Sequence, residues 1–281
     1  MSLLLSKVEG RTALSANPPP PLSKTLQQTP EFFGRTMPSI ILFTALIVLW
    51  HLATTVGGVR EYLLPSPGSV LNAMIYGDVP WWQHIRITAI EIFGAFFLAG
   101  IGGALMGTAI AWSKTISRAL MPLLVFINTF PKVAIAPLLM LWLGFGVLPN
   151  IVMGALIGFF PVVINTAVGL NQVDDDLLDL GRVFGAPKWR IFAKIRIPNA
   201  YPYIFSALKV TATSAVIGVI IGEFVSAQSG LGFVIIATQS TLNTPVAFAA
   251  LIWIAILGMS LFALVALLAR ILVPWAQVEN K

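Results

Sequence analysis

The segment DLGRVFGAPKWRIFAKIRIP, residues 179–198, is the most charged part of an otherwise apolar chain, and it holds five of the 17 Lys and Arg residues. Apolar side chains alternate with these basic ones, and glycine and proline divide the segment into short pieces. Amphipathic pieces of this kind lie at a membrane surface. The long apolar sequences on both sides of the segment indicate that it connects two parts of a membrane protein.

The composition of the whole chain indicates a membrane protein. Of its 281 residues, 57% are hydrophobic and 10% are charged, whereas soluble domains carry about 25% charged residues. A chain this apolar cannot cover its own surface with polar groups, so the bilayer is its expected solvent. The sequence contains no cysteine, which excludes a disulfide scaffold and a thiolate metal site.

Six apolar runs are close to the roughly 20 residues that a helix needs to cross a bilayer. They cover residues 37–56, 88–112, 119–145, 150–170, 203–225 and 246–273. The sequence thus predicts an all-α integral membrane protein with one transmembrane domain over 37–275. The polar, proline-rich residues 1–36 are predicted to be a disordered cytoplasmic tail, and 276–281 a cytoplasmic C-terminus.

The positions of Lys and Arg predict the orientation, because cytoplasmic loops carry an excess of these residues. The tail holds four, the loop after the second span two, and the loop after the fourth span five, whereas the stretch 226–245 holds none. Both termini and residues 174–198 are therefore predicted to face the cytoplasm. This topology accounts for the net charge of +6, and no basic stripe or zinc-finger spacing indicates a nucleic-acid partner.

Residues 174–198 predict two short amphipathic helices. Three successive aspartates at 174–176 favour a helix start through the macrodipole, and we do not interpret them as a metal site. Gly185 suits a helix end at positive φ, and Pro187 suits the first position of the next helix. Pro198 is expected to close that helix. On amphipathicity alone, an interfacial helix anchored on anionic lipid is the competing interpretation.

The order and spacing of this segment resemble the EAA signature of bacterial ABC-importer permeases. That signature reads Glu-Ala-Ala, three residues, Gly, nine residues, Ile, any residue, Leu, Pro. The corresponding positions here are Asp-Leu-Gly at 179–181, Gly185, and Ile-Arg-Ile-Pro at 195–198. The spacing matches and the acidic position is kept, whereas the two small residues that follow it are not.

In that family the signature forms a cytoplasmic coupling helix that docks in a cleft of the ATP-hydrolysing subunit. The resemblance implies that coupling to this subunit depends on Asp179, Gly181, Val183, Phe184, Gly185, Trp189 and Pro198. The apolar residues Val183, Phe184 and Trp189 are expected to make the contact. Gly185 is expected to permit the sharp turn.

Three further stretches resemble landmarks of the sulfonate, taurine and nitrate importer permeases. They are LLPSPGSVLNAMI (63–75), TFPKVAIAPLLMLWLGFG (129–146) and GEFVSAQSGLGFVI (222–235). Within that group, FPKVAIAPL, FFPVVINTAVGL and the GEF and GLG pair look most similar to permeases for pyrimidine precursors and riboflavin. The resemblance implies import of such a heteroaromatic nutrient, or alternatively of a sulfonate, taurine or another small anion.

The resemblance also implies an assembly in the bacterial inner membrane. In this assembly the chain has the type I ABC importer permease fold with six transmembrane helices. Its partners are a second copy of this chain, two ATPase subunits, and a periplasmic or lipid-anchored solute-binding protein. Transport would proceed by alternating access. No cofactor is expected on this chain, and ATP and Mg would bind the partner ATPase.

The sequence itself agrees that ATP chemistry belongs to another chain, because it contains no GxxxxGK[ST] phosphate loop. The chain is therefore not expected to be an enzyme, and neither a Ser/His/Asp set nor a catalytic carboxylate pair is evident. A self-contained transporter or channel driven by an ion gradient is the alternative from another class, since it would need no docking segment.

Ionisable residues inside spans are functional candidates, because they are costly to bury in lipid. Lys132 lies between Pro131 and Pro137 in the third span, where a broken helix is expected, and transporter sites often use interrupted helices. Asn128 and Thr129 precede it and offer polar groups to a solute. Packing, helix capping and bonds between helices are the competing roles for these residues.

Two glutamates complete the expected substrate pathway. Glu91 lies early in the second span, where Arg86 or Lys132 could pair with it. Glu223 lies near the outer end of the fifth span and could contact a docked binding protein, or it could be an interfacial residue with its carboxylate in water. His84 has no metal-ligand partner nearby in sequence, so we expect a structural role for it.

Three spans contain the pattern GxxxG, in which small residues let helix backbones approach closely in lipid. The pairs are Gly103 with Gly107, Gly154 with Gly158, and Gly218 with Gly222. We expect these three spans to pack against other helices through their glycines.

Overall fold

A computed structural model describes residues 31–226 and 228–275, with side chains from residue 37 onward. Every regular element in these ranges is a helix. The chain divides into two compact units, residues 1–50 and 51–281. Most of the predicted tail, residues 1–30, and the predicted C-terminus, 276–281, lie outside the described residues.

Helix α1 (Glu31–Thr55) covers the first predicted span except for its last residue. It begins six residues before the expected start at residue 37 and ends one residue before the expected end. Its 19 residues from Met37 to Thr55 are long and apolar enough to cross a membrane.

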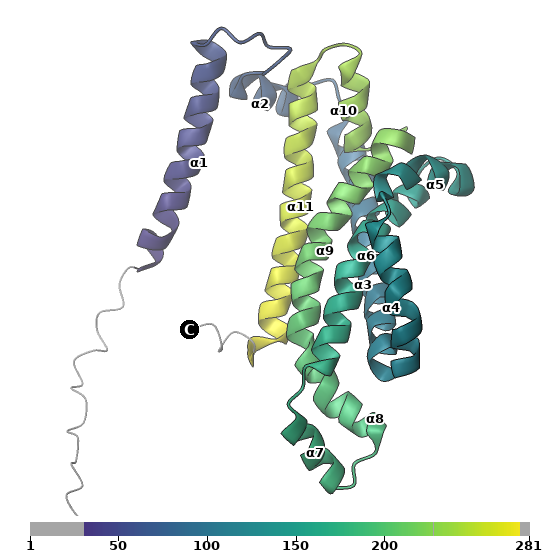
Figure 1. The fold of residues 1–281 in the computed structure, drawn as a ribbon. Coiled ribbons are helices and arrows are strands. Elements are labelled where there is room, and N and C mark those ends of the chain that lie inside the picture. The colour runs from purple at the N-terminus through teal and green to yellow at the C-terminus, as the bar shows by residue number, and fades with distance from the viewer. Residues whose placement is uncertain (1–30, 227, 276–281) are drawn as a thin grey trace, which may run out of the picture. The chain divides into compact units, whose positions relative to one another are not determined.

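The centre of the second unit consists of α3 (Trp81–Trp112), α6 (Val147–Asn171) and α9 (Ile197–Ser226). Helix α6 packs along both of the others, and α11 (Thr244–Leu272) packs against α9 (Figure 1). One core cluster joins α3, α9 and α11 through side chains that include Ile92, Val219 and Leu261. Each of these helices matches a predicted span to within a few residues, except that α3 and α9 begin about one to two turns earlier.

The GxxxG pairs lie where α3, α6 and α9 meet, as predicted. A Cβ atom on Gly218 would be 2.5 Å from the Cα atom of Gly154, and one on Gly103 would be 2.7 Å from the side chain of Val162. A Cβ on Gly107 would be 2.6 Å from the carbonyl oxygen of Val163. The helix backbones therefore approach at distances that only glycine permits.

The third predicted span is not one continuous helix. It consists of α4 (Lys114–Thr129), the 3₁₀ turn η2 (Lys132–Ile135) and α5 (Ala136–Leu143), and the two halves are bent by 84°. The break occurs at Phe130, which is extended at φ −67° and ψ 139°, because a residue before proline avoids the α region. The described part of the chain thus has five helices able to span a membrane, or six if this bent pair is counted as one span.

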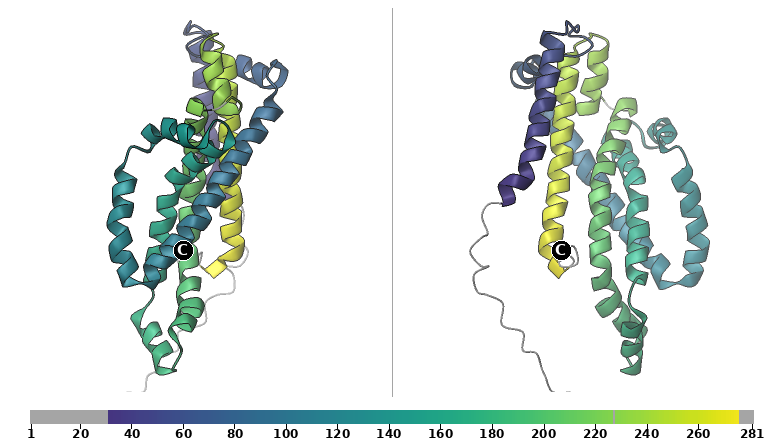
Figure 2. Two further views of the ribbon diagram at one scale, coloured as in Figure 1. Left: turned by 90° about the vertical axis from the view of Figure 1, so that its right-hand side faces the viewer. Right: turned by 60° about the vertical axis from the view of Figure 1, so that its left-hand side comes forward.

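Two short helices, α7 (Asp175–Val183) and α8 (Lys188–Ile191), lie together at one end of the central helices (Figures 1 and 2). The expected end of the second helix at Pro198 is wrong. Helix α8 continues through a π-helical stretch, η3 (Phe192–Arg196), into α9, so that Pro198 lies inside a continuous run from Lys188 to Ser226. The wider π turn accommodates a proline that lacks an N–H and would crowd the preceding turn of an ordinary α-helix.

The opposite end of the second unit contains two helices that the span analysis did not identify (Figure 1). Helix α2 (Pro67–Tyr76) begins with a Ser66 cap that accepts a bond from the Ser69 N–H at 3.1 Å, and proline occupies its first turn. Helix α10 (Leu231–Gln239) packs against α11. The serine and proline of α2 are a recognisable helix start, but both helices are too short to register as spans.

Candidate functional site

The turn between α7 and α8 has the geometry of a Schellman motif. Gly185 has φ +68°, its N–H donates to the Arg182 carbonyl at 2.9 Å, and the Ala186 N–H donates to the Gly181 carbonyl at 3.0 Å. This pair of bonds satisfies carbonyl groups at the helix end and requires a residue in the left-handed region. The predicted positive φ of Gly185 is therefore confirmed.

The start of α7 is also as predicted, since the Asp174 side chain accepts a bond from the Asp176 N–H at 3.0 Å. Pro187 is the residue immediately before α8, one position earlier than expected. Asp179 forms an ion pair with Arg182 across one turn of α7 at 2.5 Å. Both side chains of this pair are largely exposed, so the pair contributes little to stability.

The apolar residues of this segment are displayed on its surface. Val183 is 83% exposed, Phe184 78% and Trp189 59%. The other side of α7 packs against the rest of the protein, and Leu178 is buried there. Large apolar side chains exposed on both sides of the turn between α7 and α8 are typical of a docking surface, and we call Val183, Phe184 and Trp189 the tip.

The structure shows how Leu180 and Gly181 fit at the positions where the signature has two alanines. A Cβ atom on Gly181 would be 3.3 Å from the side chain of Ile191, so this position faces α8 and requires a small residue. Leu180 is exposed and accepts a larger side chain. Both residues are therefore compatible with the observed packing of α7 against α8.

Lys132 and Asn128 face each other at the break in the third span. The Lys132 ammonium group donates to Asn128 Oδ1 at 2.8 Å, and both residues are half-buried. Thr129 is exposed, and its hydroxyl donates to the carbonyl of Phe126 in its own helix. The broken helix thus presents one cation and two polar side chains within five residues.

Glu223 is buried beneath the loop that leads into α10, with 2% exposure, so the alternative that its carboxylate lies in water is wrong. Its carboxylate accepts bonds from the Thr88 hydroxyl at 2.6 Å and from the Gly232 N–H. The Leu231 N–H donates to the same hydroxyl at 2.8 Å. A side chain on Gly230 would overlap the carboxylate, so the GEF and GLG sequences form one packed unit.

Glu91 is equally buried, with 1% exposure, and its partner is neither Arg86 nor Lys132 within the described part of the chain. Its Oε1 atom accepts a bond from the Asn150 amide at 2.9 Å. The Ser226 hydroxyl donates to the Asn150 carbonyl oxygen at 2.7 Å. These contacts connect α3, α6 and α9 through polar groups.

Sequence reasoning missed three members of this cluster, namely Thr88, Asn150 and Ser226. His84 accepts a bond from the Gly230 N–H at 3.0 Å, which confirms its expected structural role. Thr88, Asn150 and Ser226 are polar residues in or next to spans, but their partners in the cluster are 59 to 143 residues away. No local spacing could have indicated that they meet.

Comparison with known proteins decides the family. Residues 99–278 match the family described as the binding-protein-dependent transport system inner membrane component. The chain belongs to this family. The permease landmarks read from the sequence are therefore confirmed, and the all-helical architecture is that of an ABC importer permease subunit.

Several curated relatives of this permease subunit cover most of its length. It is 33% identical to a riboflavin transport system permease protein of Chloroflexus aurantiacus, over 82% of this chain and 87% of the relative. A formylaminopyrimidine transport permease protein of Halalkalibacterium halodurans is 30% identical over 85% of this chain and 96% of the relative. A probable ABC transporter permease protein of Haemophilus influenzae is 32% identical over 81% and 93%.

The fold is shared with a solved structure. A chain of the MetNI methionine ABC transporter in an inward-facing conformation superimposes with a TM-score of 0.59 and 18% identity. The match covers 68% of this permease subunit and 94% of that chain. It supports the type I importer permease fold for this chain.

Proposed function

We propose that residues 174–198 form the coupling element of this permease subunit and dock on a separate ATPase subunit. The exposed tip of Val183, Phe184 and Trp189, held on a glycine turn at one end of the spans, carries the proposal. The excess of Lys and Arg in the same loop supports a cytoplasmic position, with both termini on that side. The bacterial inner membrane is the corresponding location.

The proposed mechanism is alternating access driven by ATP that the partner hydrolyses with Mg. Closure of two ATPase subunits moves two coupling elements together, and the spans then open outward to receive solute. Coupling of this kind requires contacts whose affinity differs between the two states. The bent third span is counted as one of six transmembrane helices in this proposal, and two copies of the chain surround one pathway.

The solute is proposed to be a pyrimidine precursor, riboflavin or a related heteroaromatic nutrient that a solute-binding protein delivers. The identities of 33% and 30% to permeases named for riboflavin and formylaminopyrimidine support this choice. Permeases named for sulfonates and taurine are 27–29% identical, so a small anion is the second candidate. Uptake of riboflavin, a formylaminopyrimidine and taurine by the reconstituted transporter distinguishes the two.

Docking is tested by purifying the tagged full chain in mild detergent and identifying its partners by mass spectrometry. A stoichiometric ATPase subunit is expected. Phe184→Asp should reduce its recovery several-fold, because a charged side chain replaces an apolar contact that is desolvated on docking. Leu242→Asp is the matched control, since Leu242 is also exposed but lies between α10 and α11.

Either of two results contradicts the docking proposal. If the wild-type chain is recovered without any ATPase, a transporter driven by an ion gradient becomes the better explanation. If Phe184→Asp and Leu242→Asp retain the ATPase equally, the tip is not the contact surface.

Lys132, Asn128 and Thr129 are proposed to border the substrate pathway at the broken span. Glu91 and Glu223 are proposed to support this pathway indirectly. Their buried hydrogen bonds hold together α3, α6 and α9 and the loop that leads into α10. Lys132→Met should lower solute uptake about tenfold and leave ATPase recovery unchanged, because it removes one charge-assisted contact. Normal uptake by this variant would contradict a role in the pathway and leave Lys132 with only its structural bond to Asn128.

A further inference from the structure

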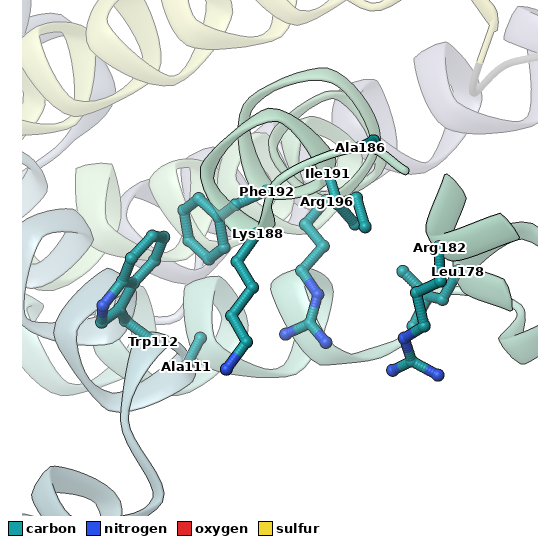
Figure 3. Close-up of a pocket in the computed structure, with 9 residues that line it drawn as sticks. All are labelled: Ala111, Trp112, Leu178, Arg182, Ala186, Lys188, Ile191, Phe192 and Arg196. Carbon is teal, nitrogen blue, oxygen red and sulfur yellow. The ribbon is translucent and has the colours of Figure 1, made fainter. Parts of the chain in front are cut away.

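A cavity of about 480 Å³ lies between the end of α3 and the segment from α7 to η3. Nine residues line it, and they come from four elements and the turn between α7 and α8 (Figure 3). None of the coupling residues named above lines this cavity. It is therefore separate from the tip.

Three of the lining residues are cations, and none is acidic. Arg182 is paired with Asp179, and one Arg196 guanidinium nitrogen is 3.4 Å from Asn171 Oδ1. The Lys188 ammonium group has no ion pair or hydrogen bond within the described part of the chain. Figure 3 shows the charged ends of Lys188 and Arg196 side by side and pointing in the same direction. Two neighbouring cations on one side of a cavity favour an anion there, because an anion can accept charge-assisted hydrogen bonds from both.

The rest of the lining is apolar. Trp112, the last residue of α3, packs edge-to-face on Phe192 with ring centroids 4.8 Å apart. Leu178 and Ile191 add aliphatic surface. A free inorganic anion gains nothing from contact with apolar side chains. A phospholipid carries glycerol and acyl carbons beside its phosphate, so it can contact the cations and the apolar residues together. Tryptophan is also enriched at the depth where these two parts of a lipid meet.

We propose that this cavity binds the phosphate group of an anionic lipid from the cytoplasmic leaflet. Lys188 and Arg196 contact the phosphate, and Trp112 and Phe192 contact the apolar part. Basic pockets at the cytoplasmic ends of transmembrane helices are known to accept lipid headgroups in this way. The bound lipid would connect the coupling segment to α3. The inference rests on the cytoplasmic orientation in the proposed function.

The test is native mass spectrometry of the purified full chain, with phosphatidylglycerol and phosphatidylcholine added at equal concentrations. Wild-type chain is expected to retain phosphatidylglycerol in preference to phosphatidylcholine. The double variant Lys188→Ala/Arg196→Ala should lower the affinity for phosphatidylglycerol roughly 30-fold. The variant Lys188→Arg/Arg196→Lys keeps both charges and should retain the lipid, which separates loss of binding from loss of folding.

The matched control is Arg190→Ala/Lys194→Ala, because both residues belong to the same segment and neither lines the cavity. Retention of phosphatidylglycerol by this control supports the proposal. Equal loss in both double variants would assign the preference to general surface charge and overturn it. Displacement of the lipid by millimolar inorganic phosphate would assign the cavity to a soluble anion and also overturn it.

The alternative occupant of the cavity is an acidic side chain of the ATPase subunit. Measuring both lipid retention and ATPase recovery for the same variant distinguishes it from a lipid. If Lys188→Ala/Arg196→Ala retains phosphatidylglycerol but loses the ATPase, the cavity belongs to the protein interface and the lipid proposal is wrong. Lipid retention is measured on the chain without its partner. A wild-type chain that binds lipid but recovers no ATPase therefore contradicts the proposed function and not the lipid site.

Discussion

Gly185→Val is expected to lower the rate of solute uptake roughly 30-fold while the membrane-spanning helices remain folded. The Gly185 backbone has φ +68°, and a Cβ atom there would meet nothing within 4 Å. The penalty is therefore conformational and not steric, and for a β-branched residue it is about 2 kcal/mol. The docking-competent turn is then a minor state, so the apparent affinity for the ATPase falls by the same factor. Uptake and solute-stimulated ATP hydrolysis by the reconstituted transporter measure the effect.

Gly185→Asn is the control for this prediction, because asparagine enters the left-handed region at much lower cost than valine. It should retain most of the uptake. Thermal unfolding of both variants should match the wild type, since the turn lies outside the packed spans. Full uptake by the valine variant would show that the turn between α7 and α8 has no part in coupling.

Gly218→Ala is expected to destabilise the helix bundle by about 2 kcal/mol, because an overpacking cost of about 3 kcal/mol exceeds the gain of about 1 kcal/mol in helix propensity. The added methyl group would be 2.5 Å from the Cα atom of Gly154 and 2.9 Å from the carbonyl oxygen of Met153. Both contacts are backbone atoms, which cannot rotate away as a side chain can. The midpoint of thermal unfolding in detergent should fall by about 4–8 °C.

Gly258→Ala in α11 is the matched substitution, because its nearest neighbour would be a Val216 methyl group at 3.4 Å, an ordinary contact. Both variants gain the same helix propensity, about 1 kcal/mol, on replacing glycine by alanine inside a helix. Gly258→Ala should therefore be as stable as the wild type or more so. Equal midpoints for the two variants would mean that α6 and α9 do not approach as closely as the structure shows.

Features that depend on a few neighbouring residues could be predicted from the sequence. The apolar runs located the long helices, and Gly185 indicated a helix end because almost only glycine adopts that conformation without strain. Pro131 and Pro137 indicated a broken span, and the break occurs beside Pro131. Pro198 was misjudged, since the rule that proline ends a helix takes no account of the π turn before it.

The sequence by itself therefore determined the membrane-spanning character, the glycine-mediated packing and the two short helices joined at Gly185, because each depends on hydropathy, backbone freedom or the spacing of neighbouring residues. Only the tertiary structure decided that Glu91 and Glu223 share one buried polar cluster, and that Trp112 meets Lys188 and Arg196 at one cavity. These residues are far apart along the chain. Their meeting depends on which helix faces pack together, and helix faces in lipid are selected by shape and polar contacts that no single segment contains.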